Sequence, residues 1–251
     1  MNKQILAWIG SISMVMLAGC TQSMAQAPAH GTMASPMAMT SSTKAAQLRA
    51  GLNNLFSEHV YLAGAATNAA LGGREAEFKA AAGALDANSV AISKAIGSVY
   101  GEGAEKAFLP LWRRHIGFVV DYTVGVAGNV KGKQDKAIND LVTYTQDFGA
   151  FLSSANPNLP KSVVADLVQH HVVTLKDVID AQASKDPARA YTALRTAAGH
   201  MQMIADPLAE AIVKQFPDSL TGKLAPVGYD ARPGSVPPGR AALRLSRAGA
   251  A

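Results

Sequence analysis

The chain has 251 residues, of which 49% are hydrophobic, 16% charged and 6% aromatic. This composition excludes a disordered acidic or basic protein as the main body, and the length allows one domain or two small ones. The net charge of +5 does not belong to the domain, because residues 20–218 carry 17 basic and 17 acidic side chains. We therefore expect no nucleic-acid partner.

The chain begins with an export leader that ends at the single cysteine. A positive start at Lys3 is followed by an apolar run over 5–19, which is too short for a comfortable membrane span. Its end, Leu17-Ala18-Gly19-Cys20, resembles a bacterial lipobox. The resemblance implies removal of signal peptide 1–19 and acylation of Cys20 by diacylglycerol and a fatty acid such as palmitate. Several acyl chains together anchor a protein stably in a membrane.

Export to the bacterial cell envelope follows from this leader. An ordinary secretory signal cut near Ala25 or Ala27 is the alternative to lipidation. Where the host has two membranes, Thr21 after the cysteine implies the outer one under the sorting rule of lipoproteins. A single cysteine also excludes an intramolecular disulfide.

Two segments without a helical pattern flank the domain. Residues 20–43 are rich in Ala, Met, Ser, Thr and Pro with hardly a charge, which predicts a flexible tether. Residues 218–251 contain Pro226, Pro233 and the pair Pro237-Pro238 and hold most of the excess basic residues, which predicts a disordered basic tail. The folded domain is expected over 44–217.

Within the domain, apolar residues recur with a helical period. Gly72-Gly73 and Asn156-Pro157 mark helix ends, Asp186-Pro187 marks a helix start, and Pro207 predicts a kink in the last helix. Six helices are predicted, over 44–71, 75–100, 104–129, 134–155, 161–184 and 187–216.

A repeat organises these helices. The segments 55–60, 111–116 and 167–172 share one pattern, in which a leucine is followed four residues later by a histidine. The histidines are His59, His115 and His171, each 56 residues after the one before. Apolar and small residues recur at the same spacing in the following helices. The sequence therefore predicts an all-α bundle of three repeated helical hairpins.

The repeat predicts a buried polar layer. Each histidine lies on the apolar face of its helix, and the second helix of each hairpin carries a polar residue at the matching position. Each such pair is equidistant from its turn, so the two residues lie at the same height in an antiparallel hairpin. The six residues are His59, His115 and His171 with Asn88, Tyr144 and His200.

Three interpretations of this layer remain open. It binds a metal, with His59, His115, His171 and His200 as ligands for copper or zinc. Met201, next to His200, favours copper because thioethers are soft ligands. Alternatively, the layer only fixes the register of the helices through hydrogen bonds. As a third interpretation, it receives an organic ligand or haem, and a ligand carrier predicts a sizeable pocket at the layer.

Other polar residues fit a solvated surface. Asp121 and Asp177 lie six residues after their histidines and so on another face, and His170 and Arg113-Arg114 also point outward by their positions. No Glu-x-x-His pair, zinc-protease motif, haem attachment motif, phosphate-binding loop or nucleophile elbow is present. We therefore expect a protein that is not an enzyme: a metal-binding lipoprotein or, alternatively, a structural or interaction module.

Several segments also carry a family resemblance. They are 58–62, Leu111-Trp112 through His115-Ile116-Gly117, Asp121-Tyr122-Thr123 and 153–157. Through them, residues 50–217 resemble a group of exported bacterial helical-repeat proteins without an established activity. Some members are joined to a segment similar to the N-terminal domain of copper amine oxidases. That segment is absent here, so the resemblance implies export and a helical fold and says little about copper.

Overall fold

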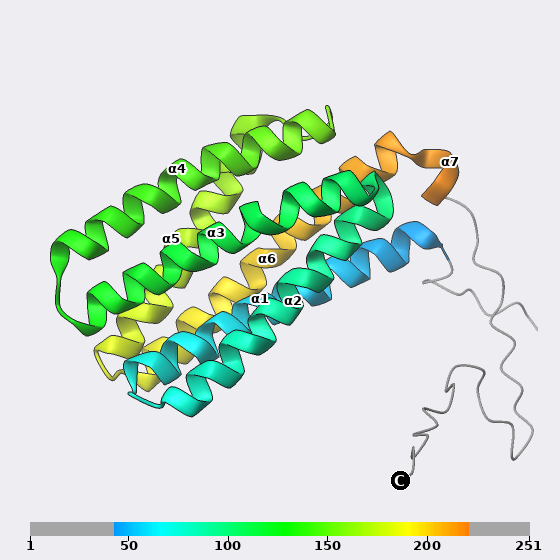
Figure 1. The fold of residues 1–251 in the computed structure, drawn as a ribbon. Helices are drawn as coiled ribbons and strands as arrows, with labels where there is room; N and C mark the ends of the chain where they lie inside the picture. Colours follow the sequence, from blue (N-terminus) through cyan, green and yellow to red (C-terminus); the bar gives the residue numbers. More distant parts are fainter. Residues whose placement is uncertain (1–42, 221–251) are drawn as a thin grey trace, which may run out of the picture. The chain divides into compact units, whose positions relative to one another are not determined.

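A computed structural model describes residues 43–220, which form seven helices and no β-strand (Figure 1). The predicted signal peptide, the Cys20 lipidation site and all but the last residue of the tether lie outside the described residues, as does the tail beyond residue 220. The helices are α1 (Lys44–Leu71), α2 (Glu75–Tyr100), α3 (Glu102–Ala127), α4 (Lys131–Ala155), α5 (Lys161–Ala183), α6 (Pro187–Gln215) and α7 (Pro217–Leu220).

The six long helices agree with the predicted ranges to within three residues, and the all-α class is confirmed. The short helix α7 was not predicted, because residues 218–251 were assigned to the tail. Pro217 accounts both for the end of α6 and for the start of α7. Proline lacks the amide hydrogen that would continue α6, yet it is a favourable first residue for a new helix.

The turns α1–α2, α3–α4 and α5–α6 share one backbone conformation. Gly73, Asn129 and Lys185 have positive φ angles of 67°, 51° and 58°. In each turn the following amide bonds the carbonyl oxygen five residues earlier, which is the longer bond of a Schellman motif. The three bonds are Arg74 N to Ala69 O (2.9 Å), Val130 N to Gly125 O (2.8 Å) and Asp186 N to Ala181 O (3.1 Å).

Capping side chains define two helix starts. The Thr43 hydroxyl accepts the amide of Ala46 at 3.1 Å, and the Asp186 carboxylate accepts the amide of Arg189 at 3.0 Å. These bonds satisfy amides that have no partner inside the helix. The predicted start at Asp186-Pro187 is therefore confirmed. Pro207 lies inside α6, and the kink expected there stays a prediction.

At the end of the bundle opposite the three turns, one polar network ties the helix ends together. The Asn156 amide donates to the Tyr100 hydroxyl at 3.0 Å, and that hydroxyl donates to Gln215 Oε1 at 3.0 Å. The Gln215 amide in turn donates to the carbonyl oxygen of Ala155 at 2.9 Å. The ends of α2, α4 and α6 are thus fixed relative to one another.

The six long helices form a closed ring. Each packs on the next along the chain, and α6 packs back on α1. Arg49 of α1 pairs with Asp206 and Glu210 of α6, at 2.9 and 3.1 Å, across this closing contact. The odd-numbered helices α1, α3 and α5 also contact one another, so they surround the centre of the bundle. Side chains on their inner faces are consequently the ones that can meet.

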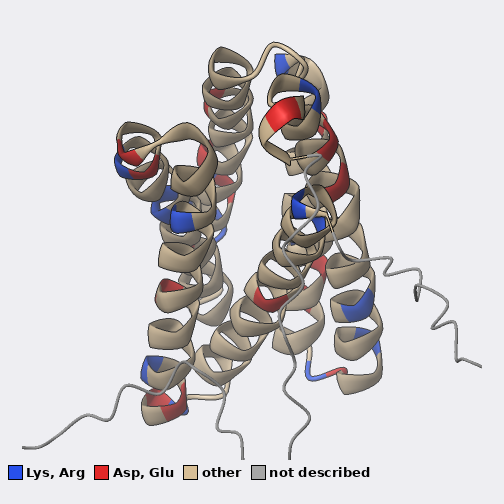
Figure 2. Cartoon of the chain, turned by 90° about the vertical axis from the view of Figure 1, so that its right-hand side faces the viewer, with Lys and Arg blue, Asp and Glu red and all other residues tan. Residues whose placement is uncertain are grey.

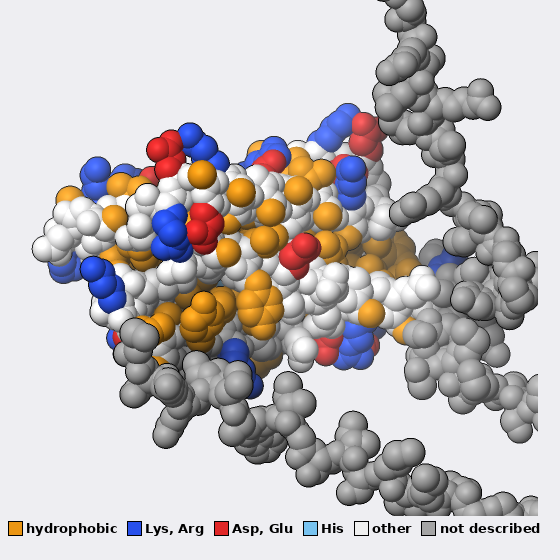
Figure 3. All heavy atoms as spheres, turned by 90° about the horizontal axis from the view of Figure 1, so that it is seen from below, with side chains coloured by type: hydrophobic (Ala, Val, Ile, Leu, Met, Phe, Trp, Pro, Cys, Tyr) orange, Lys and Arg blue, Asp and Glu red, His pale blue; other side chains and the backbone are white. Residues whose placement is uncertain are grey.

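The surface carries both signs of charge. Figure 2 shows basic and acidic residues scattered over the helices, and many of them pair, as Arg113 does with Asp86 at 2.6 Å and Arg114 with Asp147. Asp121, Asp177 and His170 are exposed, as expected. On the face drawn in Figure 3, hydrophobic side chains lie interspersed with charged and polar ones. No described helix has the length and hydropathy that crossing a membrane requires.

Candidate metal centre

Three histidines meet at the centre of the ring. His59 of α1, His115 of α3 and His171 of α5 are 1%, 3% and 5% exposed, and each offers a ring nitrogen such that the three all lie within 4.8 Å of one another. They meet because each occupies the inner face of an odd-numbered helix, at the same distance from its turn. We call these residues the histidine triad.

His59 is the middle member of the triad. Its Nε2 lies 3.4 Å from Nε2 of His115, and its ring centre lies 5.3 Å from that of His115 and 5.9 Å from that of His171. Trp112 covers one side, with its ring centre 4.9 Å from His59 and 4.6 Å from His115. Phe56 and Phe108 stack on Trp112 in turn. The triad thus borders an aromatic wall.

Burial keeps all three imidazoles neutral at ordinary pH. Loss of water is the main cause that lowers the pKa of His115 to about 3 and of His171 to about 4, and it lowers the pKa of His59 well below its usual value. Repulsion between the rings acts in the same direction, since His115 and His171 each disfavour a charge on His59. A neutral imidazole is the form of histidine that binds a metal.

The triad has unused hydrogen-bonding capacity. His59 Nδ1 and both ring nitrogens of His171 are buried without a hydrogen-bond partner among the described residues. Such atoms are rare in folded proteins, because a buried polar atom without a partner is costly. His171 is therefore the triad member with both ring nitrogens free to bind an ion.

The spacing also fits a shared ion. Two nitrogens that each lie ~2.0–2.1 Å from a tetrahedral metal are about 3.4 Å apart. The two Nε2 atoms of His59 and His115 lie at this separation. Among the described residues, these three histidines are a group of side chains that could hold a metal ion.

His200, the fourth predicted ligand, does not belong to this group. Its Nε2 hydrogen-bonds to the carbonyl oxygen of Leu167 at 3.0 Å, and its ring stacks on that of His170 at 4.2 Å. Asn88 behaves in the same way, since its amide donates to the carbonyl oxygen of Leu55 at 2.9 Å. In both hairpins the second helix thus bonds a backbone carbonyl of the first, four residues before the triad histidine.

Tyr144 occupies the matching position in the middle hairpin without making that bond. Its ring centre lies 5.1 Å from that of His115 and 5.9 Å from the Arg114 guanidinium. Its hydroxyl is buried without a partner among the described residues. Burial raises the pKa of Tyr144 well above its usual value, so the phenol stays protonated. The predicted polar layer therefore divides into a central triad and three flanking residues.

Met201 lies beside the triad. It is 1% exposed and lines a cavity of about 20 Å³ together with His115, His171 and Tyr144. Met203, two residues further along α6, points to solvent with 56% exposure. Of the two methionines, Met201 is therefore the one that shares a cavity with triad residues.

Sequence reasoning missed two parts of this region. Trp112 had drawn no functional interpretation, although it precedes His115 by three residues and so lies on the same face. The second is a cavity of about 220 Å³ between α1, α2 and α3, which His59 and His115 help to line. Its other walls consist of small and apolar side chains on several helices, a combination that no local pattern reveals.

Comparison of the chain with protein-family models, curated proteins and solved structures gave no match.

Proposed function

We propose that this protein is a non-catalytic envelope lipoprotein that binds one copper or zinc ion through the histidine triad. The observation that carries the proposal is the convergence of three buried imidazoles within 4.8 Å, from three different helices. Neutral rings and partly unpartnered nitrogens support it, because these are the groups that coordination would use.

The surroundings favour copper(I) over zinc. Catalytic zinc sites pair three protein ligands with a water molecule, whereas the triad is enclosed by Trp112, Tyr144 and aliphatic side chains. Met201 lies on the same small cavity as His115 and His171 and offers a thioether. Soft ligands and a dry site suit Cu(I).

Metal loading tests this function. The full chain, loaded with Cu(I) under reducing conditions or with Zn²⁺ and then dialysed, should retain one ion per chain by elemental analysis. A His170→Gln variant is the matched control, because it removes an exposed histidine next to the triad. It should retain the same amount. Retention of no ion by the unmodified chain after both loadings would refute the metal centre.

A structural role for the layer is the second candidate function. The hydrogen bonds from Asn88 to Leu55 and from His200 to Leu167 favour it, because they fix the height of α2 against α1 and of α6 against α5. In this case contacts such as that between His59 and His115 would fix the heights of the helices relative to one another. Triad variants would then change stability alone.

The finer architecture also belongs to the proposal. We infer that the bundle consists of three copies of one hairpin with a 56-residue repeat. The three turns support this inference, since their positive-φ residues Gly73, Asn129 and Lys185 are spaced like the histidines. The matched bonds of Asn88 and His200 support it as well. The packing of α1, α3 and α5 around one centre is what such a repeat would produce.

Attachment to the membrane is tested at Cys20. Mass spectrometry of the N-terminal peptide from membrane-purified protein should find a chain that starts at Cys20 with its thiol acylated. A Cys20→Ala variant should leave the membrane fraction, because it removes the acceptor of the acyl chains. Cleavage after Ala25, or an unmodified Cys20 within a longer peptide, would contradict lipidation.

A further inference from the structure

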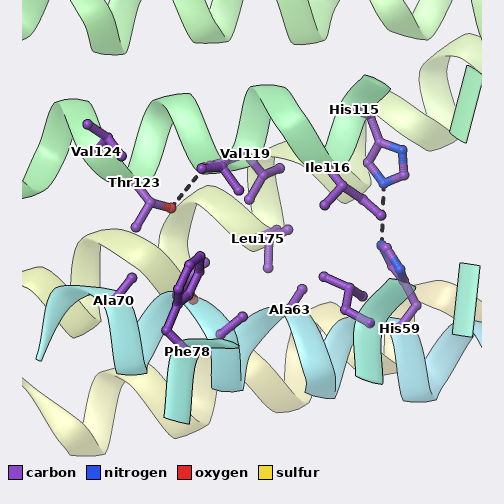
Figure 4. Close-up of a pocket in the computed structure, with 14 residues that line it drawn as sticks. His59, Ala63, Ala70, Phe78, His115, Ile116, Val119, Thr123, Val124 and Leu175 are labelled. Atoms are coloured by element: carbon purple, nitrogen blue, oxygen red, sulfur yellow. Dashed lines mark hydrogen bonds between the residues drawn. The ribbon is translucent and has the colours of Figure 1, made fainter. Parts of the chain in front are cut away.

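The cavity of about 220 Å³ beside the triad is long and narrow. In Figure 4 its lining runs from His59 and His115 at one end to Ala70 and Val124 at the other. These ends are about three helical turns apart along α1 and about two and a half along α3, so the lining extends over roughly 14–16 Å. A volume of this size drawn out over that length fits a slender molecule.

The wall of the cavity is apolar along this length. No charged side chain lines it, and its polar side chains are two histidines and two threonines. The Nε2 atoms of His59 and His115 contact each other at 3.4 Å. The Thr67 hydroxyl donates to Gln182 Oε1 at 2.8 Å, and the Thr123 hydroxyl donates to a carbonyl oxygen of its own helix at 2.8 Å. A polar group of a ligand would therefore lose its hydration inside the cavity without compensation.

The cavity is closed at the histidines and reaches solvent toward its other end. His59 and His115 are buried, whereas Val120 and Val124 of the lining are 40% and 51% exposed. Phe78, which α2 contributes to the lining, is only partly buried. A molecule with one polar end can consequently keep that end in water beside the valines while its apolar part extends to the imidazoles.

Length and volume both favour an unbranched hydrocarbon chain. Carbon–carbon bonds of about 1.5 Å advance an extended chain by about 1.25 Å each, so about ten carbons occupy the roughly 14–16 Å between the ends. The six carbons of benzene fill an apolar cavity of about 150 Å³ in another protein, and in proportion about 220 Å³ accommodates about nine. The two limits agree.

We propose that this cavity binds one unbranched alkyl chain of about nine or ten carbons, carried by a free single-chain amphiphile such as a medium-chain fatty acid. The methyl end lies against His59 and His115, and the head group stays in water beside Val120 and Val124. The site needs no metal, although two triad histidines belong to its wall. Lipid binding is thus a function separate from the proposed metal centre.

Saturated fatty acids of six, eight, ten and twelve carbons are the probes. Each is titrated by calorimetry into the full Cys20→Ala chain with a chelator, so that neither a metal nor the proposed acyl anchor occupies the site. Decanoate should bind one per chain with a Kd of roughly 0.1 mM or tighter. From six to ten carbons, each added methylene should tighten the Kd about fourfold, because it becomes buried. Dodecanoate should gain little more, since its extra carbons remain in water.

Two further probes test the orientation and the shape of the ligand. Decyltrimethylammonium has a head group of opposite charge and should bind with a Kd similar to that of decanoate, because the head stays in water. Adamantane-1-carboxylate carries the head group of decanoate on a compact cage and should not bind. Binding of this cage as tightly as decanoate, or a Kd independent of chain length, would overturn the proposal.

One variant locates the chain inside the cavity. Ala63→Leu places a larger side chain on the wall about one turn from His59, so octanoate and decanoate should bind it no more tightly than hexanoate does. Ala84→Leu, on the exposed face of α2, is the matched control and should leave the series unchanged. A Kd that still tightens up to ten carbons in Ala63→Leu would contradict the placement. The series without this substitution decides the matter even where Ala63→Leu fails to fold.

The outcome is separable from the metal test. All probes are titrated in the absence of metal, so a chain that retains neither copper nor zinc can still show the ten-carbon limit. That result would support the cavity while the metal centre is refuted. Metal retention by a chain that binds none of the fatty acids would support the metal centre and refute the cavity.

Discussion

Replacement of His115 by glutamine is expected to abolish stoichiometric metal retention. His115 contributes a nitrogen to the triad and lies 3.4 Å from the nearest nitrogen of His59, so its loss leaves only two of the three imidazole ligands. Loss of an outer-shell partner alone weakens metal affinity about 10- to 100-fold, and loss of a ligand should exceed this. Elemental analysis after loading and dialysis should fall from one ion per chain to a small fraction.

The matched control for this experiment is His200→Gln. His200 is as buried as the triad but bonds the carbonyl of Leu167, so the same substitution there should preserve metal retention. Loss of metal in both variants would support a four-histidine ligand set instead. Unchanged metal retention in His115→Gln would contradict the triad as the metal centre.

A bound metal also stabilises the native state. At a metal concentration of ~100 Kd it adds about 2.7 kcal/mol to the free energy of unfolding, and the melting temperature rises accordingly. A thermal melt therefore provides a second readout.

The free energy of unfolding of the metal-free protein is expected to fall steeply between about pH 7.5 and about pH 5. The folded-state pKa of His115 is about 3 and that of His171 about 4, while an unfolded histidine titrates near its ordinary value of 6.5. Below that value the unfolded chain binds protons that the native state refuses, so stability is complete above pH ~6.5 and is lost as the pH falls. Below pH ~6.5 each such histidine lowers the free energy of unfolding by about 1.4 kcal/mol per pH unit, so the three together should lower it by several kcal/mol at pH 5.

Urea unfolding in the presence of a chelator at the two pH values measures this loss. A His115→Leu variant should show a smaller loss, because one of the three contributions is removed. His170→Gln should behave like the unmodified chain, since His170 is exposed. Equal stability at both pH values would show that the triad does not stay neutral in the native state. The Asp206 carboxylate adds nothing to this loss, because its hydrogen bond from Arg49 holds its pKa below the ordinary carboxyl value and its stabilising contribution is lost only at lower pH.

The sequence predicted the helices and the meeting of the three histidines because both depend on regular spacing. The breaks at Gly72-Gly73, Asn156-Pro157 and Asp186-Pro187 follow from local backbone chemistry. The burial of His59, His115 and His171 follows from their place on apolar helix faces. Equal distance from the turns then placed them at one height.

What the sequence did not predict depends on side-chain directions and on packing between helices. His200 matches Asn88 and Tyr144 in position, but its ring reaches the carbonyl of Leu167 in its own hairpin and does not join the centre. The cavity depends on how far α1, α2 and α3 stand apart, and small residues such as Ala63 and Ala66 occur on each of the six long helices. Helix α7 was missed because its four residues are too few for a period to appear.

The closure of α6 on α1 has a consequence for how the chain could be rearranged. α1 and α6 pack directly, and α7 contacts both, so the two ends of the described chain lie close together. Neither end is threaded through the centre, where α1, α3 and α5 meet. The packing therefore permits circular permutation, in which a linker joins α7 to α1 and new termini open beside Gly101, between the first two hairpins. The order of the hairpins along the gene would change while every helix contact around the ring, and the triad at its centre, stayed the same.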